Sequence, residues 1–291
     1  MYMVNLNTTQ KIRIATVVYR LVSGIRCLFG KSDQVVIRRN GITWELDLRE
    51  GIDFSIFLLG GFELATLRLY ESLLGAGDIV LDIGANIGAH TLPFAKLVGK
   101  NGRVYSFEPT QYAFEKLGRN VRANPAISSS VELVHAMLVS ESRNFITPEL
   151  YSSWPLHEEE GLHKQHRGKL MSTSDAAVIT LDEFVNRKGI ARVDFVKLDV
   201  DGNEASVLAG GMNTLRQFRP RVLMEWAPYL FGDNSAVMEH VLRNFINLGY
   251  CPKEPSGRRV LPKTFEALNS LVPKYGSMNV LFETGDVDLG Q

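Results

Sequence analysis

A run of apolar residues that ends in an acid and a glycine-punctuated turn constrains the fold of this chain more than any other segment. Residues 80–88 read V-L-D-I-G-A-N-I-G, and a helical pattern of apolar residues begins directly afterwards, at residues 90–97. Such an apolar run is typical of a strand buried on both faces of a parallel sheet. Gly84 and Gly88 allow the backbone to turn tightly and to approach a ligand closely. The segment is therefore predicted to be the first strand–turn–helix unit of a nucleotide-type α/β domain.

The spacing within this turn excludes two common phosphate-binding loops. The dinucleotide fingerprint requires glycine at its first, third and sixth positions, which are Gly84, Asn86 and Ala89 here. The P-loop ends in Lys followed by Ser or Thr, and no such pair follows Gly88. The pattern D-x-G-x-N-x-G, which begins at Asp82, instead resembles the loop that holds S-adenosylmethionine (SAM) in class I methyltransferases.

Strand-like and helix-like segments alternate after residue 60, as a doubly wound sheet requires. Strands are predicted at residues 79–83, 103–107, 131–136, 193–198, 221–225 and, at the edge of the sheet, 279–282. Helices are predicted near residues 62–75, 88–98, 111–123, 181–187, 203–216 and 235–248. This order predicts an α/β fold with a doubly wound, seven-stranded, mostly parallel Rossmann-like sheet whose final strand is antiparallel.

The first 59 residues are predicted to form a helix and a β-hairpin that extend the main domain of residues 60–291. Apolar residues recur at helical spacing over residues 10–30, interspersed with Lys and Arg. The helix either packs on the domain or on a second subunit, or it rests weakly on anionic lipid. Residues 34–48 alternate around Asn40-Gly41, a strong hairpin signal.

Residues 141–178 interrupt the alternation and are predicted to be an insertion. Three histidines, His157, His163 and His166, lie in it, but their spacing matches no common metal-ligand motif. A long loop inside a compact domain is usually functional or disordered. The insertion is therefore predicted to be either a lid over the acceptor, with Trp154 available to stack on a sugar, or an ordinary solvated loop.

Composition limits the partners and the compartment. The 32 acidic residues balance 32 Lys and Arg, so no bulk positive field favours nucleic acid. Two cysteines, Cys27 and Cys251, fit a reduced chain, with a single disulfide left open. No apolar run reaches the ~20 residues that span a bilayer, and no signal-peptide core is present. We expect a soluble, cytoplasmic protein without an integral membrane span or a nucleic-acid partner.

The chemistry of SAM predicts where its parts would bind. A carboxylate best holds the ribose diol, and Glu108 lies 24 residues after Gly84, close to the ~20-residue offset of a ribose acid. Glu108 alone would also suit a helix N-terminus. The methionine tail is predicted over the turn from Gly84 to Gly88, where the next helix begins. Asp82 and Asn86 are predicted to contact the tail or to fix the loop. Adenine is predicted near His135 and Ala136; His135 either contacts it or is a structural histidine.

A second predicted strand also ends in acids. Residues 194–204 read D-F-V-K-L-D-V-D-G-N-E, which places Asp199, Asp201 and Glu204 within six residues. The carboxyl ends of strands are where open α/β sheets bind ligands. A solvated turn would account for Asp201 and Glu204, but not for Asp199, which closes an apolar strand. Glu225 similarly ends the next apolar strand.

Together the motifs D-I-G-A-N-I-G, D-F-V-K-L-D-V-D-G-N-E and R-P-R-V-L-M-E resemble the FkbM family of SAM-dependent methyltransferases. Residues 180–184 (T-L-D-E-F) and Phe62-Glu63 match the same pattern, and the resemblance covers about residues 60–230. It implies SAM as cofactor, a cofactor-binding role for Glu63, and O-methylation of a sugar, glycan or polyketide-type hydroxyl. One departure is visible: the family usually reads D-V-E-G-x-E, and Asp201 replaces the first glutamate.

An alcohol needs a general base, because the SAM methyl is already activated by its sulfonium. Asp199, Asp201 and Glu204 are the predicted candidates, followed by Glu225. Asp199 and Glu225 also occupy the strand ends that hold a divalent ion in catechol-type methyltransferases. In those enzymes an Asp-Asn pair follows the fifth strand, whereas this chain has Glu225-Trp226 there. No metal site is therefore predicted. Two alternatives remain: a methyltransferase that acts on protein or nucleic acid, and a non-catalytic SAM-binding module.

Overall fold

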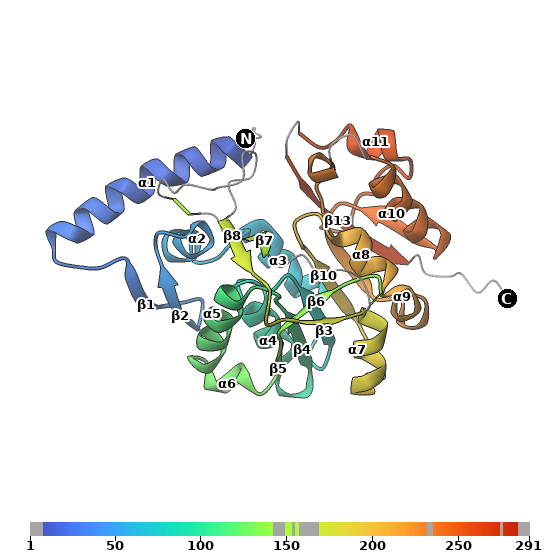
Figure 1. Ribbon diagram of the computed structural model, residues 1–291, viewed down its shortest axis with the longest axis horizontal. Helices are drawn as coiled ribbons and strands as arrows, with labels where there is room; N and C mark the ends of the chain where they lie inside the picture. Colours follow the sequence, from blue (N-terminus) through green and yellow to red (C-terminus); the bar gives the residue numbers. More distant parts are fainter. Residues whose placement is uncertain are drawn as a thin grey trace.

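The computed structural model describes residues 8–141, 149–152, 155–156, 169–231, 235–273 and 276–284. A seven-stranded sheet runs through the centre of the molecule, with helices on both faces (Figure 1). Its strands are β3 (Ile79–Ile83), β4 (Arg103–Phe107), β5 (Val131–Val134), β10 (Phe195–Leu198), β11 (Arg221–Trp226), β12 (Tyr250–Lys253) and β13 (Met278–Thr284). In space they follow the order β12-β13-β11-β10-β3-β4-β5.

Within this sheet only β13 runs against its neighbours, β11 and β12. The remaining pairs are parallel. This confirms the predicted doubly wound, mostly parallel α/β fold. The strand order changes direction between β3 and β10, because β4 and β5 follow on one side and β11 on the other. Open α/β sheets bind ligands at such a switch point, outside the carboxyl ends of the strands.

The helices cover both faces because successive strand residues point in opposite directions. Leu81 shares an apolar core with Phe184 and Phe245 on one face, whereas Val80 packs with Tyr70 and Phe94 on the other. The helices of this domain are α3 (Leu64–Leu73), α4 (Thr91–Val98), η1 (Gly99–Asn101), α5 (Gln111–Arg122), α6 (Pro125–Ser128), α7 (Leu181–Lys188), α8 (Glu204–Ala209), α9 (Met212–Phe218), η2 (Pro228–Phe231), α10 (Ala236–Asn247) and α11 (Phe265–Asn269).

Three predicted elements need correction. The strand predicted at residues 131–136 ends at Val134, and a separate strand, β6 (Ala136–Leu138), begins after His135. The helix predicted at residues 203–216 is divided into α8 and α9 at Gly210, where a Cβ would lie 2.1 Å from the Val139 carbonyl oxygen.

The third correction concerns the edge of the sheet. The strand predicted at residues 279–282 is β13, which lies inside the sheet, and the edge is β12, which was not predicted. Pro252 in β12 lowers the strand signal of the sequence. Proline is tolerated on an edge because that position does not need every backbone N–H for pairing.

The N-terminal extension consists of α1 (Thr8–Leu28), β1 (Gln34–Arg39), β2 (Ile42–Asp47) and α2 (Gly51–Leu59). The predicted hairpin is confirmed, since β1 pairs antiparallel with β2. Asn40 and Gly41 both have positive φ angles, 51° and 79°, as a two-residue hairpin turn of the favoured hand requires. Helix α1 agrees with the helix predicted at residues 10–30, whereas α2 was not predicted.

This extension packs against the main domain. Trp44 and Leu46 of β2 share an apolar core with Ile87 and Leu117. The backbone N–H of Glu45 donates to the side chain of Asn120 on α5 over 2.8 Å. A buried ion pair between Asp53 of α2 and Lys116 of α5 adds a charged contact. The boundary at residue 59 stays a prediction.

Parts of the insertion are described. β7 (Glu149–Ser152) pairs antiparallel with β8 (Lys169–Ser172), and β9 (Ala177–Ile179) pairs parallel with β6. Trp154 and the three histidines, His157, His163 and His166, lie outside the described residues.

Two expectations about the chain as a whole can be compared with the structure. Cys27 is exposed, Cys251 is half-buried, and both are free thiols. Among the helices in the described ranges, none is both long and apolar enough to cross a bilayer.

Candidate active site

A pocket of about 520 Å³ opens at the switch point between β3 and β10. Its walls come from the turns that follow β3, β4 and β10, from β6, and from the β7–β8 hairpin. Of the residues predicted for the site, those that line this pocket are Gly84, Asn86, Glu108, Ala136, Asp199 and Asp201.

The turn after β3 brings the backbone very close to β10. Gly84 has a φ of 86°, and a Cβ at this position would lie 1.8 Å from the carbonyl oxygen of Asp199. No other residue type fits there without moving one of the two segments. Asn86 also has a positive φ, 48°, and its side chain donates to the Ser152 hydroxyl over 3.2 Å. The turn therefore contacts both the second acidic motif and the β7–β8 hairpin.

Glu108 lies at the end of β4, and its carboxylate is held by the surrounding chain. One oxygen accepts from the Thr110 backbone N–H over 2.9 Å and from the Thr110 hydroxyl over 2.5 Å. The other oxygen accepts from the Asn86 backbone N–H over 2.9 Å. A carboxylate offers about four acceptor positions, so Glu108 keeps one for a ligand. Desolvation raises its pKa, and the bonds from Thr110 and Asn86 oppose that effect.

Two residues of the predicted glycine loop lie beneath the pocket surface. Asp82 is fully buried and accepts a 2.5 Å hydrogen bond from the Thr91 hydroxyl at the start of α4. Gly88 has a φ of 93°, and a Cβ there would lie 2.8 Å from a methyl group of Leu117. These two residues thus fix the shape of the turn and do not line the cavity.

Glu63 and His135 also lie outside the pocket lining. Glu63 accepts a 3.0 Å hydrogen bond from Asn279 of β13, and desolvation and then the Asp199 charge raise its pKa. His135 stacks on Phe114 at a centroid distance of 4.4 Å, and its Nε2 lies 3.2 Å from the Pro109 carbonyl oxygen. These contacts agree with the structural alternative for His135, and its contact with adenine stays a prediction.

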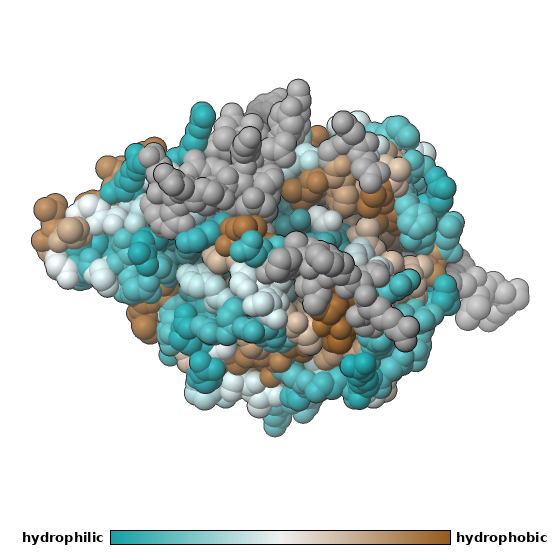
Figure 2. Space-filling view, in the orientation of Figure 1, coloured by the Kyte–Doolittle hydropathy of each residue, from teal (hydrophilic) through white to brown (hydrophobic). Residues whose placement is uncertain are grey.

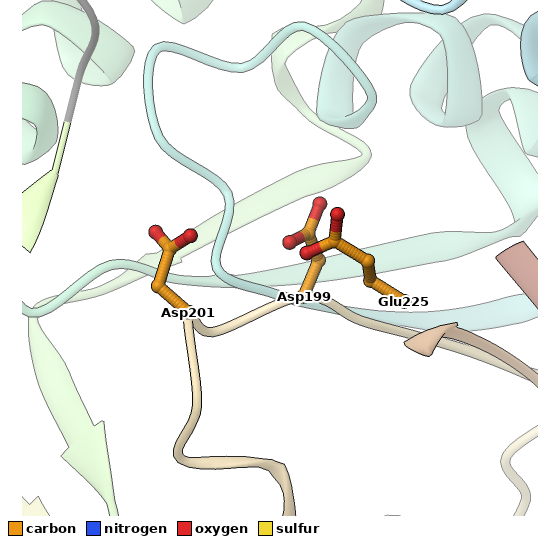
Figure 3. Close-up of side chains that lie close together, drawn as sticks. All are labelled: Asp199, Asp201 and Glu225. Atoms are coloured by element: carbon orange, nitrogen blue, oxygen red, sulfur yellow. The ribbon is translucent and has the colours of Figure 1, made fainter. Parts of the chain in front are cut away.

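The second acidic motif brings three carboxylates together. Asp199, Asp201 and Glu225 each present an oxygen, and these oxygens lie within 4.8 Å of one another. Figure 3 shows all three carboxylates pointing to the same side of the sheet, with Asp199 next to Glu225. Asp201 has a φ of 49° and is exposed to the solvent of the pocket, whereas Asp199 and Glu225 are half-buried.

The three carboxyl groups differ in pKa because only Asp199 has a cationic partner. Desolvation raises the pKa of Asp199, but the charge of Lys197 and its 2.8 Å hydrogen bond more than offset this, so the pKa lies below its usual range. Desolvation and then the charges of Asp199 and Glu204 raise the pKa of Asp201 to about 8. Desolvation and the Asp199 charge hold the pKa of Glu225 well above normal. Asp199 is thus ionised at neutral pH, whereas the ionised form of Glu225 is disfavoured.

Glu204, the last predicted catalytic residue, is buried and does not line the pocket. One of its oxygens accepts from the backbone N–H groups of Val200 and Gly202, at 3.2 and 3.3 Å. Desolvation raises its pKa to about 7, although these backbone bonds act in the opposite direction. Glu204 therefore shapes the turn that presents Asp201.

Sequence reasoning did not assign a role to Lys197. It is the buried lysine of the apolar strand β10, and Asp199, Asp82 and Glu63 together raise its pKa against the effect of desolvation. A lysine within F-V-K-L is the signal that could have indicated it, because a buried lysine needs a charged partner. The wall formed by Glu149, Leu150 and Leu170 was anticipated only as part of a lid.

Within the described ranges, the acidic cluster is also the group of side chains with the right donors for a hard divalent cation. One oxygen of Asp199 already accepts a hydrogen bond from Lys197, and desolvation and the Asp199 charge hold the pKa of Glu225 well above normal. The arrangement suits proton transfer at the pocket surface, where Asp201 is accessible and has a raised pKa.

Comparison with known proteins identifies the family. The family model described as the methyltransferase FkbM domain matches residues 82–251, more than half of the chain. The chain therefore belongs to the FkbM methyltransferase family, as its motifs predict.

Two curated proteins are similar to this chain in sequence. The hexuronic acid methyltransferase AglP of Haloferax volcanii is 27% identical over 154 residues, which cover 53% of this chain and 58% of AglP. The 31-O-demethyl-FK506 methyltransferase FkbM of Streptomyces tacrolimicus is 28% identical over 158 residues, 47% of this chain and 60% of that protein. The chain thus spans about three fifths of the length of these relatives.

Among solved structures, the chain is similar to a methyltransferase FkbM from Methylobacillus flagellatus KT. The TM-score is 0.46 and the sequence identity 16%, over 76% of this chain and 48% of that one.

Proposed function

We propose that this methyltransferase takes its methyl group from SAM and transfers it to a hydroxyl oxygen of a sugar, glycan or polyketide-like small molecule. The observation that carries the proposal is a single pocket of about 520 Å³ in which the Gly84 turn, Glu108 and Asp201 meet. The names of the two relatives, one a hexuronic acid methyltransferase and one a 31-O-demethyl-FK506 methyltransferase, support this class of acceptor.

The residues of the pocket fit SAM at three points. Glu108 keeps one acceptor position for a ribose hydroxyl. The turn after Gly84 leads into the N-terminus of α4, and the positive end of a helix dipole favours the carboxylate of a methionine tail. Met137 and Leu138 give the pocket an apolar wall suited to an adenine ring. When bound, SAM supplies a methyl group already activated by its sulfonium.

The remaining chemical task is to orient the acceptor and remove its proton. We assign the general base to Asp201, because its carboxylate lines the pocket, is exposed there and has a pKa raised to about 8. A base whose pKa lies near the working pH is the most effective. One oxygen of Asp201 would accept the hydroxyl proton as the acceptor oxygen attacks the methyl carbon.

The other predicted acids suit this role less well. Asp199 is paired with Lys197, which lowers its pKa and its basicity. The pKa of Glu225 is held well above normal by desolvation and the Asp199 charge, and neither Glu225 nor Glu204 lines the pocket. We therefore assign positioning roles to these three residues: Asp199 and Glu225 stabilise the floor of the site, and Glu204 holds the turn.

The donor is tested by titrating SAM into the purified protein in a calorimeter. Removing the charge in Glu108→Gln should weaken SAM binding by about 10- to 100-fold, the range for losing a hydrogen bond to a charged group. Glu115→Gln, the same change at an exposed residue of α5, is the matched control and should bind SAM normally. If the native protein does not bind SAM, the proposed donor is wrong. If both variants bind equally well, only the role of Glu108 is wrong.

The acceptor class is tested with methyl-labelled SAM and a panel of hexuronic acids, oligosaccharides and macrolide alcohols, each with and without a chelator. The expected result is labelling of at least one hydroxyl compound that persists with the chelator. Labelling confined to protein or RNA would contradict the proposed class of acceptor, and activity lost to chelation would show that the reaction needs a metal.

A further inference from the structure

The outer face of α1 presents a continuous row of exposed apolar side chains. These side chains are about half exposed or more. They follow one another at intervals of three or four residues, which places them on one side of the helix. The row, called here the outer stripe, consists of Ile14 (51% exposed), Val17 (59%), Leu21 (64%), Ile25 (58%) and Leu28 (85%). Phe29, which follows the helix, is 75% exposed and extends the same apolar end.

The opposite face of α1 is fixed against the protein. Ile12 and Tyr19 are buried, and the Tyr19 ring packs edge-on against Phe54 of α2 at 5.7 Å. The hydroxyls of Tyr19 and Ser23 donate to Asp33 over 2.8 and 3.0 Å. Because these contacts define the inner face, the helix cannot bury the outer stripe by rotating, and the stripe stays directed away from the domain.

The segment of the sequence that contains α1 is basic, whereas the rest of the chain is acidic. The first 32 residues contain five Lys and Arg and no acid, whereas the remaining residues contain 27 basic and 32 acidic side chains. Arg13 and Arg20 are both exposed and lie seven residues apart, which puts them along the same edge of the outer stripe. The apolar surface of α1 is thus bordered along one edge by positive charge, in a chain that is neutral as a whole.

We propose that α1 docks the protein onto the surface of an anionic lipid membrane, with the outer stripe inserted among the acyl chains and the basic residues at the headgroups. A helix with one apolar face and a basic border, held parallel to a surface, is the usual form of an interfacial anchor. In Figure 1, α1 lies along the periphery of the molecule. Hydrophobic side chains gather at its outer, left-hand end in Figure 2.

Charge complementarity favours lipid over a second copy of the chain. If two outer stripes packed against each other about a twofold axis, the basic side chains of both helices would border one contact, and like charges at an interface are unfavourable. An anionic membrane instead pairs these charges with negative headgroups. The docking is independent of the proposed reaction, since no residue of α1 lines the pocket.

The test is flotation of the full-length protein with vesicles of phosphatidylcholine alone or of phosphatidylcholine mixed with phosphatidylglycerol. Val17→Asp places a charge in the outer stripe and should abolish flotation. Val260→Asp makes the same change at a valine of almost equal exposure, 57%, outside α1, and should float like the native protein. Arg13→Ala should reduce the partition coefficient about fivefold, the effect of one basic residue near an anionic surface.

We expect flotation only with the anionic vesicles, and weaker flotation at high salt because screening reduces the attraction. Equal flotation of the native protein and Val17→Asp would overturn the proposal, as would no flotation of the native protein or equal flotation with neutral vesicles. Light scattering measures the oligomeric state of both proteins. If the native protein is a dimer and Val17→Asp is a monomer, the outer stripe binds a second copy of the chain and the lipid proposal is wrong.

Discussion

Two clusters in this protein each combine a buried lysine with three acids, and they differ in what surrounds the acids. The anchor cluster consists of Lys116 with Asp47, Glu50 and Asp53, between the N-terminal extension and α5. The pocket cluster consists of Lys197 with Asp199, Asp201 and Glu225. Both lysines are only 3% exposed, so burial of the cation does not distinguish the clusters.

The two clusters differ in the hydrogen-bond donors that surround their acids. In the anchor cluster, Asp53 accepts from Lys116 and from the Asp47 backbone N–H, and Asp47 accepts from Gln34 over 2.7 Å and from Arg49. Burial raises the pKa of Asp47, but the bonds and charge of Arg49 more than offset it and hold the pKa low. Donors keep this acid ionised, as expected for a structural contact.

In the pocket cluster the acids face one another and share one cation. Asp201 is repelled by Asp199 and Glu204, and its pKa is raised to about 8. Clustered acids with too few donors are costly for stability and are typical of functional sites. The anchor cluster follows the same rule, because burial raises the pKa of Glu50 to about 7 while Asp47, with its donors, keeps a low pKa. The comparison teaches that the supply of donors to each acid, more than the number of acids, decides which acids stay ionised.

The comparison predicts its largest effect at Asp201. Replacing the proposed base in Asp201→Asn should lower turnover about 10²- to 10⁴-fold, the usual contribution of a general base. Asp201→Glu should retain part of the activity, because it restores a carboxylate. Thermal unfolding and SAM binding by calorimetry should show little change in either variant. Asp175→Asn, at an exposed turn, is the control, and native turnover in Asp201→Asn would place the base elsewhere.

In the anchor cluster the main effect should be on stability. Lys116→Met leaves the Asp53 carboxylate buried without its cation and should lower the free energy of unfolding by about 3–5 kcal/mol in urea titrations. The double variant Asp53→Asn, Lys116→Met removes the charge and keeps an acceptor for the Asp47 N–H, so most of the loss should be recovered. Turnover per folded molecule should stay native. A double variant no more stable than Lys116→Met would contradict this interpretation.

A pH titration sharpens the contrast. Because the pKa of Asp201 is raised to about 8, the base is mostly protonated at pH 6 and 7. We expect kcat/KM, which reports the free enzyme, to rise roughly tenfold per pH unit below about 8 and then to level off. The profile of Lys116→Met should have the same shape. A native profile that is flat across this range would show that an ordinary carboxylate such as Asp199 acts instead.

The smallest effect is expected at the exposed rim of the anchor cluster. Arg49 is half exposed, and its bonds to Asp47 are therefore screened by solvent. Arg49→Ala should cost less than about 1 kcal/mol of unfolding free energy. A loss as large as that of Lys116→Met, measured in the same urea titration, would mean that the rim and the buried pair act as one network.

The fold was predictable from the sequence wherever a local pattern decides it. The apolar run that ends at Asp82 gave β3 and its turn, and Asn40-Gly41 gave the hairpin, because period and turn chemistry are local properties. Edge strand β12 was missed because four residues that include Pro252 have too little pattern. The division between α8 and α9 depends on the Val139 carbonyl, which no local rule relates to Gly210.

For the site, the sequence predicted which acids would gather but not how each is paired. The strand ends placed Asp199, Asp201 and Glu225 at one edge, because parallel strands bring their carboxyl ends together. That Glu204 binds backbone N–H groups, or that His135 stacks on Phe114, depends on side-chain directions that spacing does not determine. The division of roles within the cluster follows from Lys197, whose importance becomes clear only from its burial.

The parallel pairing of β6 with β9 has an evolutionary consequence. The chain leaves the domain after Leu138 and returns at Ala177 beside the same strand, so both ends of the intervening segment are held together. The entropy cost of a loop rises only slowly with its length. This segment can therefore be lengthened, shortened or exchanged between homologues while the sheet and the side of the pocket proposed for the methyl donor stay unchanged. Acceptor preference could diverge quickly in a lineage that conserves everything else.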